Sequence, residues 1–547
     1  MTTIDTHVAS APAAAGPRLA CVADWLTTTD HKRLGRLYIG TGAIAFLAPV
    51  VASLLLGLER ISPTRELLQV GSLTQLFALQ RFGFNYLALV PLLLGVALAI
   101  VPLQVGARAL ALPRLAAAGF WAWCVGALLA GFALLNNGGP GGGNPRFVDL
   151  FTLAAALIAA GLLSAVVALL TTILTTRSPG MNMRRLPFFT WSVLVGSLGL
   201  LVALPVLIGN LLYVYFAHHY ASGSELSGNG ALGQWAGLSF TQPTTIIFVI
   251  PVFGFLAEAV ATGSRQRLRT RGFTYTGIGL LGVAAFGTVL QWPATLRTGF
   301  LDASLGDKVD DLLPYAMVHL LPLLGAFIAF SLPLRGIAAK PKISTPLVFA
   351  VLAGVLALGG VAASALNHIA DAGLIGTTYE EGTWLLLVFS GVLATMGAVA
   401  YWGPKWWGRS LPMKTSLPLA ALAFVGAGIS ALSLMIAGFA DQPGGVFPRV
   451  EAGKDAVVNF DYSGPMALWN TLNVAGLCLL LLSVLTFAAL ALRTFRRGEI
   501  AGDDPWDGQT LEWATTSPAP ADNFAALHIV QSAEPLLDLK PSNRSDA

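Results

Sequence analysis

The sequence predicts an all-α polytopic membrane protein with twelve transmembrane helices, and three observations support this fold class. Of its 547 residues, 55% are hydrophobic and only 11% charged, whereas soluble domains average about 25% charged. Apolar runs of about 20 residues recur, and each is long enough to cross the hydrocarbon core. Basic residues alternate between the loops on the two sides of these runs. This hydrophobic composition excludes a soluble enzyme and a disordered chain. A nucleic-acid-binding protein is excluded because the net charge is only +4 and is spread over short loops.

Each predicted span is an apolar run bounded by polar or basic loops. The connections are short, so neighbouring helices are expected to be antiparallel. The twelve spans cover residues 37–58, 83–106, 115–136, 148–174, 188–216, 237–262, 273–292, 313–334, 345–366, 383–403, 416–439 and 465–492.

The distribution of lysine and arginine predicts the orientation. Loops on one side carry most of the basic residues, for example Arg265, Arg267, Arg269 and Arg271, and the opposite loops carry few. Because basic loops stay in the cytoplasm, both termini are expected to be cytoplasmic. The expected organisation is a cytoplasmic N-terminal segment (1–30), a membrane domain (31–497) and a cytoplasmic tail (498–547). The Gly- and Asn-rich residues 136–146 are expected to form a flexible external turn.

Four stretches resemble subunit I of the haem-copper oxidases, the cytochrome c oxidase type. The similarity spans nearly the whole chain and looks especially like the actinobacterial subunit, which implies a bacterial plasma membrane. The four stretches are residues 25–32 (WLTTTDHK); residues 179–181 (PGM) with 203–206 (ALPV); residues 401–405 (YWGPK); and residues 504–524, which include TLEWAT, SP and NF.

The resemblance implies six intramembrane histidines that hold two haems and one copper, and this chain lacks all six. One helix-ten register places two of these positions at Gly382 and Trp384, and a shifted register places them at Trp384 and Leu386. We therefore predict no haem, no copper, no other metal site and no catalytic residue. The vestigial ligand positions are Gln80, Gln242, Pro293, Ala294, Gly382 and Trp384.

The proton-path positions implied by the resemblance are also replaced. Thr244 stands at the position of the glutamate and Ile246 at that of the cross-linked tyrosine. Ala326 stands for the lysine of one channel, and Ala109 for the aspartate at the mouth of the other. The arginine pair that contacts haem propionates falls on Asp441 and Gln442. We expect no continuous proton path.

The remaining polar residues within or beside the spans have structural and functional interpretations. His218 and His219 are expected to form an interfacial polar cap, with a surface divalent-metal site as the alternative. His319 is either a hydrogen-bonded core histidine or a functional intramembrane group. These histidines, with His31 and His368, are expected to lie scattered at different depths. Glu258 is expected to pair structurally, with a role in a proton relay as the alternative. Glu380 and Glu381 are expected to form a solvated helix N-terminus.

Three functions remain open. The leading hypothesis is a cofactor-free homologue of oxidase subunit I that acts as a structural, assembly or regulatory partner of a respiratory membrane complex. The second is an active cytochrome c oxidase subunit I in aerobic electron transport. The third is binding or transport of a small molecule or lipid in the vacated haem cavities. The expected partners are the lipid bilayer and other oxidase or respiratory-complex subunits, and we expect a residual cavity near Gln242.

Overall fold

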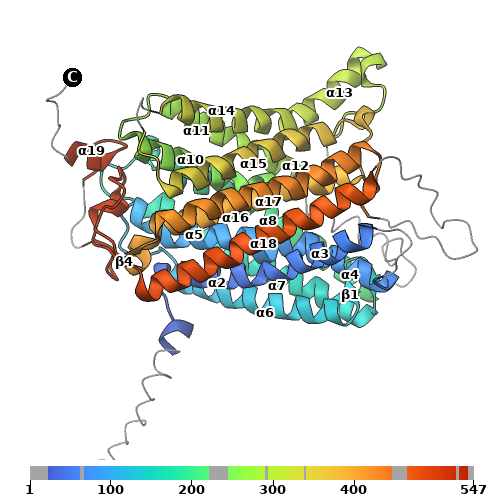
Figure 1. The fold of residues 1–547 in the computed structure, drawn as a ribbon, viewed down its shortest axis with the longest axis horizontal. Helices are drawn as coiled ribbons and strands as arrows, with labels where there is room; N and C mark the ends of the chain where they lie inside the picture. The colour runs from blue at the N-terminus through green and yellow to red at the C-terminus, as the bar shows by residue number, and fades with distance from the viewer. Residues whose placement is uncertain are drawn as a thin grey trace, which may run out of the picture.

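The computed structural model describes residues 23–61, 67–220, 244–289, 294–337, 341–445, 465–524 and 529–539. Long helices run side by side and form one bundle (Figure 1). Within the described ranges, eleven segments are long and apolar enough to cross a membrane. They are His31–Ile61, Ser72–Gln104, Pro113–Leu135, Pro145–Thr175, Phe188–Tyr220, Thr245–Ser264, Leu305–Arg335, Thr345–Asn367, Thr378–Trp407, Met413–Phe439 and Met466–Arg497.

The remaining predicted span, residues 273–292, is not a single continuous helix. Helix α11 (Arg271–Leu281) passes into a 3-10 turn, η4 (Gly282–Ala284), and then into α12 (Ala285–Val289). Residues 290–293 lie outside the described part. The structure therefore supports a polytopic helical membrane fold, while the number twelve stays a prediction.

Several spans are interrupted where proline removes a backbone donor. The first consists of α2 (His31–Ala45) and α3 (Leu47–Ile61), which meet at Phe46. Pro49 lacks an N–H and its ring crowds the carbonyl four residues earlier, so the helix breaks there. The second span joins α4 (Val70–Phe82) to α5 (Val90–Gln104) through a π-helical segment, η1 (Gly83–Leu89). Pro91 cannot donate to the carbonyl of Leu87, which suits this wider turn.

Three segments form the interior of the bundle. They are α5 with η1, α10 (Thr244–Ser264) and α16 (Thr378–Trp407), and nearly every side chain along them is buried. The surrounding helices bury only one face. They expose large apolar side chains such as Leu128, Leu135 and Phe273, which suits contact with lipid.

Most outer helices fit together through small residues. In α6 (Pro113–Leu135) and α7 (Pro145–Thr175), a Cβ on Gly119 would lie 2.5 Å from the carbonyl oxygen of Gly161. Only glycine permits that approach, as is usual where membrane helices pack closely. The remaining outer spans are α8 (Phe188–Tyr220), α13 (Leu305–Tyr315) with η6 (Ala316–Leu320) and α14 (Leu321–Arg335), α15 (Thr345–Asn367), α17 (Met413–Phe439) and α18 (Met466–Arg497).

The segment after α18 folds back over one end of the bundle, which we call the tail end. Strand β4 (Glu499–Ile500) pairs antiparallel with β3 (Arg409–Ser410), which follows α16. The chain continues through a 3-10 turn, η8 (Leu511–Ala514), to the short helix α19 (Pro535–Leu539) (Figure 1). We call the opposite end of the bundle the distal end.

At the distal end, the loop predicted to be a flexible turn forms a small hairpin. Strand β1 (Gly138–Gly139) pairs antiparallel with β2 (Gly142–Gly143). Gln75 Nε2 donates to the carbonyl of Gly142 at 2.9 Å and to Asn137 Oδ1 at 3.0 Å. These bonds attach the hairpin to α4.

Candidate functional site

A buried polar cluster joins α3, α4 and α16 in the distal half of the bundle. Arg60 Nη2 lies 2.6 Å from Glu381 Oε2. Gln80 Nε2 donates to Glu381 Oε1 at 2.7 Å and to Ser53 Oγ at 3.0 Å. These four residues, Ser53, Arg60, Gln80 and Glu381, are named the Arg60 cluster below.

The Arg60 cluster is nearly inaccessible to solvent. Gln80 is 1%, Arg60 3% and Glu381 7% exposed. Arg60 also donates to the carbonyl of Gly444 at 2.7 Å. The prediction that Glu381 belongs to a solvated helix N-terminus is therefore wrong. Glu381 does lie in the first turn of α16, but that turn packs inside the bundle, where only a paired carboxylate is tolerated.

Gly382, one of the predicted vestigial ligand positions, has no room for a side chain. A Cβ there would lie 2.5 Å from the carbonyl oxygen of Ala431 and 2.6 Å from Met435 Cγ. Both neighbours belong to α17, so α16 and α17 meet at this glycine. A histidine at residue 382 would require α17 to move.

Trp384, the neighbouring vestigial position, fills the space between interior helices. Its indole Nε1 donates to Asn85 Oδ1 at 3.2 Å, and its ring packs edge-on against Phe84 at 5.6 Å between centroids. Asn85 Nδ2 reaches Thr245 Oγ1 at 3.5 Å. The indole is therefore a packed core group tied to η1 and α10.

These positions do not fit a haem. Gln80 offers an amide whose nitrogen is bonded to Ser53 and Glu381, Gly382 has no side chain, and Trp384 offers an indole donor. Haem iron is held by imidazole, thiolate, thioether or phenolate donors. Moreover, the Gln80–Glu381 hydrogen bond joins α4 directly to α16, which leaves no space between those two side chains. In the alternative register, Leu386 has no donor atom.

Of the other predicted ligand and proton-path positions, some lie within the described residues and some lie outside them. Gln242 and Pro293 lie outside the described residues, so the expected cavity near Gln242 stays a prediction. Ala294 is buried, with a left-handed φ of 51°. The proton-path positions Ile246 and Ala326 are fully buried, Ala109 is exposed, and Thr244 begins α10.

A small cavity lies beside these interior helices. It has a volume of about 20 Å³ and lies between α5, α8 and α10. That is room for about one water molecule.

The structure corrects the prediction that the histidines are scattered for two of them, His319 and His368. His319, in η6, stacks on His368, at the end of α15, with ring centroids 4.1 Å apart and an interplanar angle of 25°. His368 Nδ1 lies 2.8 Å from the carbonyl oxygen of Ser364. Stacked rings do not point their lone pairs at a common centre, so the pair packs as a core contact.

His218 and His219 share one carboxylate. Their Nδ1 atoms lie 2.7 Å and 2.8 Å from the two oxygens of Asp149 on α7. This arrangement matches the expected polar cap at the distal end. Within the described ranges, no group of three or more His, Cys, Asp or Glu side chains is arranged to hold a metal ion.

A second buried polar region lies under the tail. Thr510 Oγ1 donates to Glu258 Oε1 at 3.1 Å, and the amide of Phe189 reaches Glu258 Oε2 at 3.4 Å. Glu512 Oε1 accepts from Gln104 Nε2 at 3.0 Å and from Trp402 Nε1 at 3.2 Å. Glu258 therefore pairs structurally, as predicted, although its partner comes from the tail.

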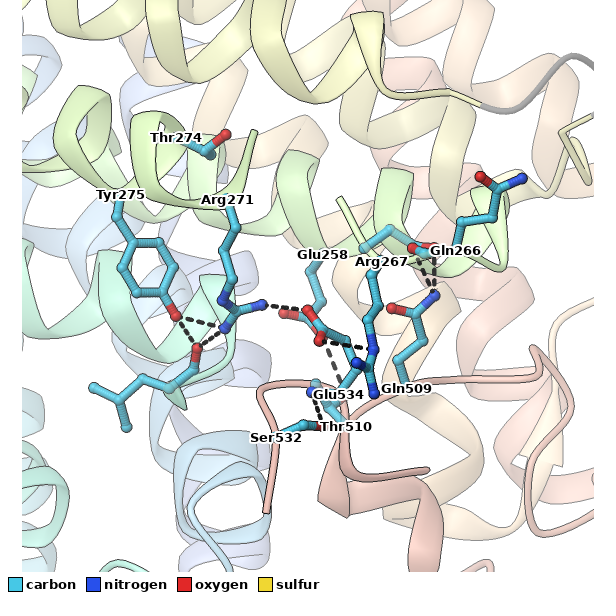
Figure 2. A network of polar contacts seen from close by, with 12 residues as sticks. Glu258, Gln266, Arg267, Arg271, Thr274, Tyr275, Gln509, Thr510, Ser532 and Glu534 are labelled. Atoms are coloured by element: carbon cyan, nitrogen blue, oxygen red, sulfur yellow. Dashed lines mark hydrogen bonds and ion pairs between the residues drawn. The ribbon is translucent and has the colours of Figure 1, made fainter. Parts of the chain in front are cut away.

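Arg271, the first residue of α11, attaches the last described part of the tail. Arg271 Nη1 lies 2.8 Å from Glu534 Oε1, and its other nitrogen reaches Tyr275 Oη at 2.6 Å (Figure 2). Gln509 Nε2 donates to the carbonyl of Ala261 at 2.8 Å. Figure 2 shows Glu258 and Arg271 close to Glu534 of the tail.

The tail also attaches to the start of α2. Asn523 Oδ1 accepts from Lys32 Nζ at 3.0 Å and lies 3.0 Å from His31 Nε2. Asn523 Nδ2 donates to the carbonyl of Ala107 at 2.8 Å. Two of the sequence strings that carry the family resemblance thus contact each other.

Sequence reasoning missed the role of Arg60. One signal was available: Arg60 follows the first predicted span and Glu381 precedes the tenth, so both lie at the distal end. Opposite charges at adjacent apolar runs favour an ion pair, because an unpaired charge there is costly.

Taken together, the bundle of apolar helices and its polar interior define a multi-pass helical membrane protein. The chain belongs to the family described as "Cytochrome C and Quinol oxidase polypeptide I", whose profile matches residues 33–479. This confirms the resemblance inferred from the four sequence stretches.

Several curated relatives match over nearly their full length. "Probable cytochrome c oxidase subunit 1-beta" of Nocardia farcinica is 29% identical, over 96% of this chain and 90% of the relative. "Cytochrome c oxidase subunit 1" of Bacillus subtilis is 27% identical, over 94% and 82%. The protein of the same name from Corynebacterium glutamicum is 29% identical, over 98% and 92%.

Proposed function

We propose that the chain is a cofactor-free member of this family that acts as a structural, assembly or regulatory partner of a respiratory membrane complex. The observation that carries the proposal is the hydrogen bond of 2.7 Å between Gln80 and Glu381. It joins the helices that carry three of the predicted vestigial ligand positions, Gln80, Gly382 and Trp384. The ion pair with Arg60 reinforces the contact.

The packing around α16, which corresponds to the tenth predicted span, supports the same proposal. Gly382 contacts α17 so closely that no ligand side chain fits, and Trp384 packs against Phe84 and Asn85. Emptying a haem site would leave a void that destabilises the protein. Side chains that pack into the vacated region remove part of that cost.

A role as a partner of other subunits is supported by the tail, a part of the chain that takes no part in redox chemistry. The family's tail is retained, and it is attached through buried residues such as Glu512 and Asn523. A chain that had lost all function would not need this ordered end. The proposed partners are other oxidase subunits or respiratory-complex proteins in the same membrane.

The alternative function is an active cytochrome c oxidase subunit I. It is favoured only by the relatives' names, since the ligand positions in this sequence carry no imidazole. Lipid or small-molecule binding is favoured by a specific groove, described below.

The proposed orientation places the tail end in the cytoplasm of a bacterial plasma membrane. Most basic loops lie at that end, as the positive-inside rule requires. Cysteine substitution of exposed Arg265, followed by labelling with a membrane-impermeant maleimide in intact cells and in lysed cells, tests this placement. Labelling only after lysis supports it, and labelling in intact cells contradicts it.

A pyridine haemochrome assay with copper analysis on protein purified from its native membrane tests the central proposal. We expect substoichiometric haem and copper, and no oxygen consumption with reduced cytochrome c. Two haems per chain would refute the proposal. A subunit I relative prepared in the same way is the positive control.

A further inference from the structure

An apolar groove runs along the tail-end half of the bundle between α2 and α18. Its volume is about 420 Å³, within the range of about 300–1,000 Å³ typical of ligand sites. Gly40 and Ala43 of α2 form one wall, and Ala488 and Phe495 of α18 form the other. Side chains of α16, including Met396, form the floor.

The groove exists because α18 contacts α3 closely but separates from α2 toward the tail end. At the distal end α18 packs on α3, where a Cβ on Gly57 would lie 2.8 Å from Val474 Cγ2. Along α2 there is free space instead, since a Cβ on Gly40 would meet no atom within 4 Å. Gly40, Ala488 and Leu492 are exposed, so the groove opens to the outside of the bundle, where the bilayer lies.

The polar character of the groove is concentrated at its tail-end mouth. Among the described residues that line it, Arg36 alone carries a charge. The Arg36 guanidinium lies over the Trp25 ring, 5.2 Å from its centroid. Lys32 and Arg33 pair with Asp30 and Asp24, whereas the described ranges contain no ion pair for Arg36.

We propose that this groove binds an anionic phospholipid, with one acyl chain along α16 and the headgroup phosphate at Arg36. An acyl chain matches the apolar walls, which water does not fill favourably. Arginine binds phosphate through paired N–H donors, and Trp25 lies where aromatic side chains meet headgroups. The charge at the mouth selects a phospholipid over a neutral isoprenoid.

The test uses full-length protein in nanodiscs of equimolar phosphatidylglycerol and phosphatidylcholine, with retained lipids counted by native mass spectrometry after mild delipidation. We expect one phosphatidylglycerol per chain to resist removal. Arg36→Gln should lower the ratio of retained phosphatidylglycerol to phosphatidylcholine about fivefold, as expected for one basic residue at an anionic surface. Arg114→Gln, which removes an exposed charge on α6 outside the groove, is the matched control.

A second pair of variants tests the apolar part of the groove. Gly40→Leu should lower lipid retention about tenfold by filling the groove, while Gly209→Leu, at an exposed glycine of α8 with equal free space, should not. Ala488→Phe fills the groove from α18. It provides a second measurement of lipid retention in case Gly40→Leu reduces the folding yield. Retained lipid that mirrors the bulk mixture, a neutral isoprenoid in its place, or unchanged retention in both filling variants overturns the proposal. Haem content, measured separately, decides the proposed function independently of this result.

Discussion

Gln80 Nε2 donates a hydrogen bond of 2.7 Å to Glu381 Oε1, across the interface between α4 and α16. The same carboxylate holds Arg60 at 2.6 Å. A buried ion pair is stable only when both partners stay and further hydrogen bonds satisfy them. Gln80 supplies one of those bonds, so the residue at a predicted vestigial ligand position supports a charge pair.

Breaking this pair on one side should destabilise the protein strongly. Arg60→Leu leaves Glu381 buried and unpaired, and we expect a loss of roughly 3–5 kcal/mol in the free energy of unfolding. The double variant Arg60→Leu with Glu381→Leu should lose much less, because no uncompensated charge remains. Urea or guanidinium unfolding in detergent, followed by tryptophan fluorescence, measures both.

The exposed residue Arg146 provides the control for that series, since Arg146→Leu removes an equal charge without a buried partner. Equal losses in the single and double variants would show that packing, and not the charge pair, accounts for the effect.

Adding one methyl group at Gly382 should also destabilise the bundle. Gly382→Ala places a Cβ 2.5 Å from the carbonyl oxygen of Ala431, so α16 and α17 must separate. Overpacking of this kind costs about 1–3 kcal/mol. Gly428→Ala, on α17 with open space around its added Cβ, should change the thermal midpoint little. A Gly382→Ala protein with the wild-type midpoint would mean that residue 382 has room for a side chain.

The sequence predicted the fold class and the family because both depend on local sequence features and not on contacts between distant residues. Apolar runs and basic loops mark the helices, and short strings such as residues 25–32 mark the family. The interruption of the span at residues 273–292 was missed because the run carries no charged residue, and hydropathy does not report a 3-10 turn at Gly282.

The candidate site was less accessible to sequence reasoning. The sequence predicted that the ligand histidines are missing, but the contacts of the residues at those positions depend on segments far apart in the chain. Arg60 and Glu381 are separated by 321 positions. The stacking of His319 on His368 likewise could not be predicted, because it depends on how η6 packs against the end of α15.

The stability of the docked tail should depend on pH through Glu512. Burial raises the pKa of this carboxyl above its ordinary value of 4.5, although hydrogen bonds from Gln104 and other donors oppose the shift. The folded protein therefore binds this proton more tightly than the unfolded chain. The contribution to stability is complete below pH 4.5 and is lost as the pH rises through the raised pKa.

Glu512→Gln should remove this dependence, because glutamine keeps an acceptor for Gln104 and Trp402 but has no proton to lose. We expect the wild-type free energy of unfolding to fall by up to about 1.4 kcal/mol per pH unit in that window, and the variant to show a flatter profile. Thermal unfolding between about pH 5 and 8 measures the difference. Parallel profiles for the two proteins would assign the pH dependence to other groups.

Asn523 should be the residue on which the attachment of the tail to α2 depends most. Its side chain accepts from Lys32 at 3.0 Å and donates to Ala107 at 2.8 Å, and it is fully buried. Its φ of 62° is a left-handed conformation that asparagine and glycine tolerate. Asn523→Gly therefore removes the hydrogen bonds without straining the backbone, and Asn523→Ala adds that strain.

We expect Asn523→Gly to weaken docking by roughly 3 kcal/mol, given about 1 kcal/mol per hydrogen bond and more for one from a charged donor. Limited proteolysis, read as the rate of cleavage within residues 498–539, should rise in Asn523→Gly and rise further in Asn523→Ala. Because Asp522, next in the chain, is exposed, Asp522→Ala is the matched control and should be cleaved at the wild-type rate. If Asn523→Gly is cleaved no faster than this control, the other contacts of the tail, such as those of Glu512 and Arg271, are enough to hold it, and the link between residues 25–32 and the tail is not needed for docking.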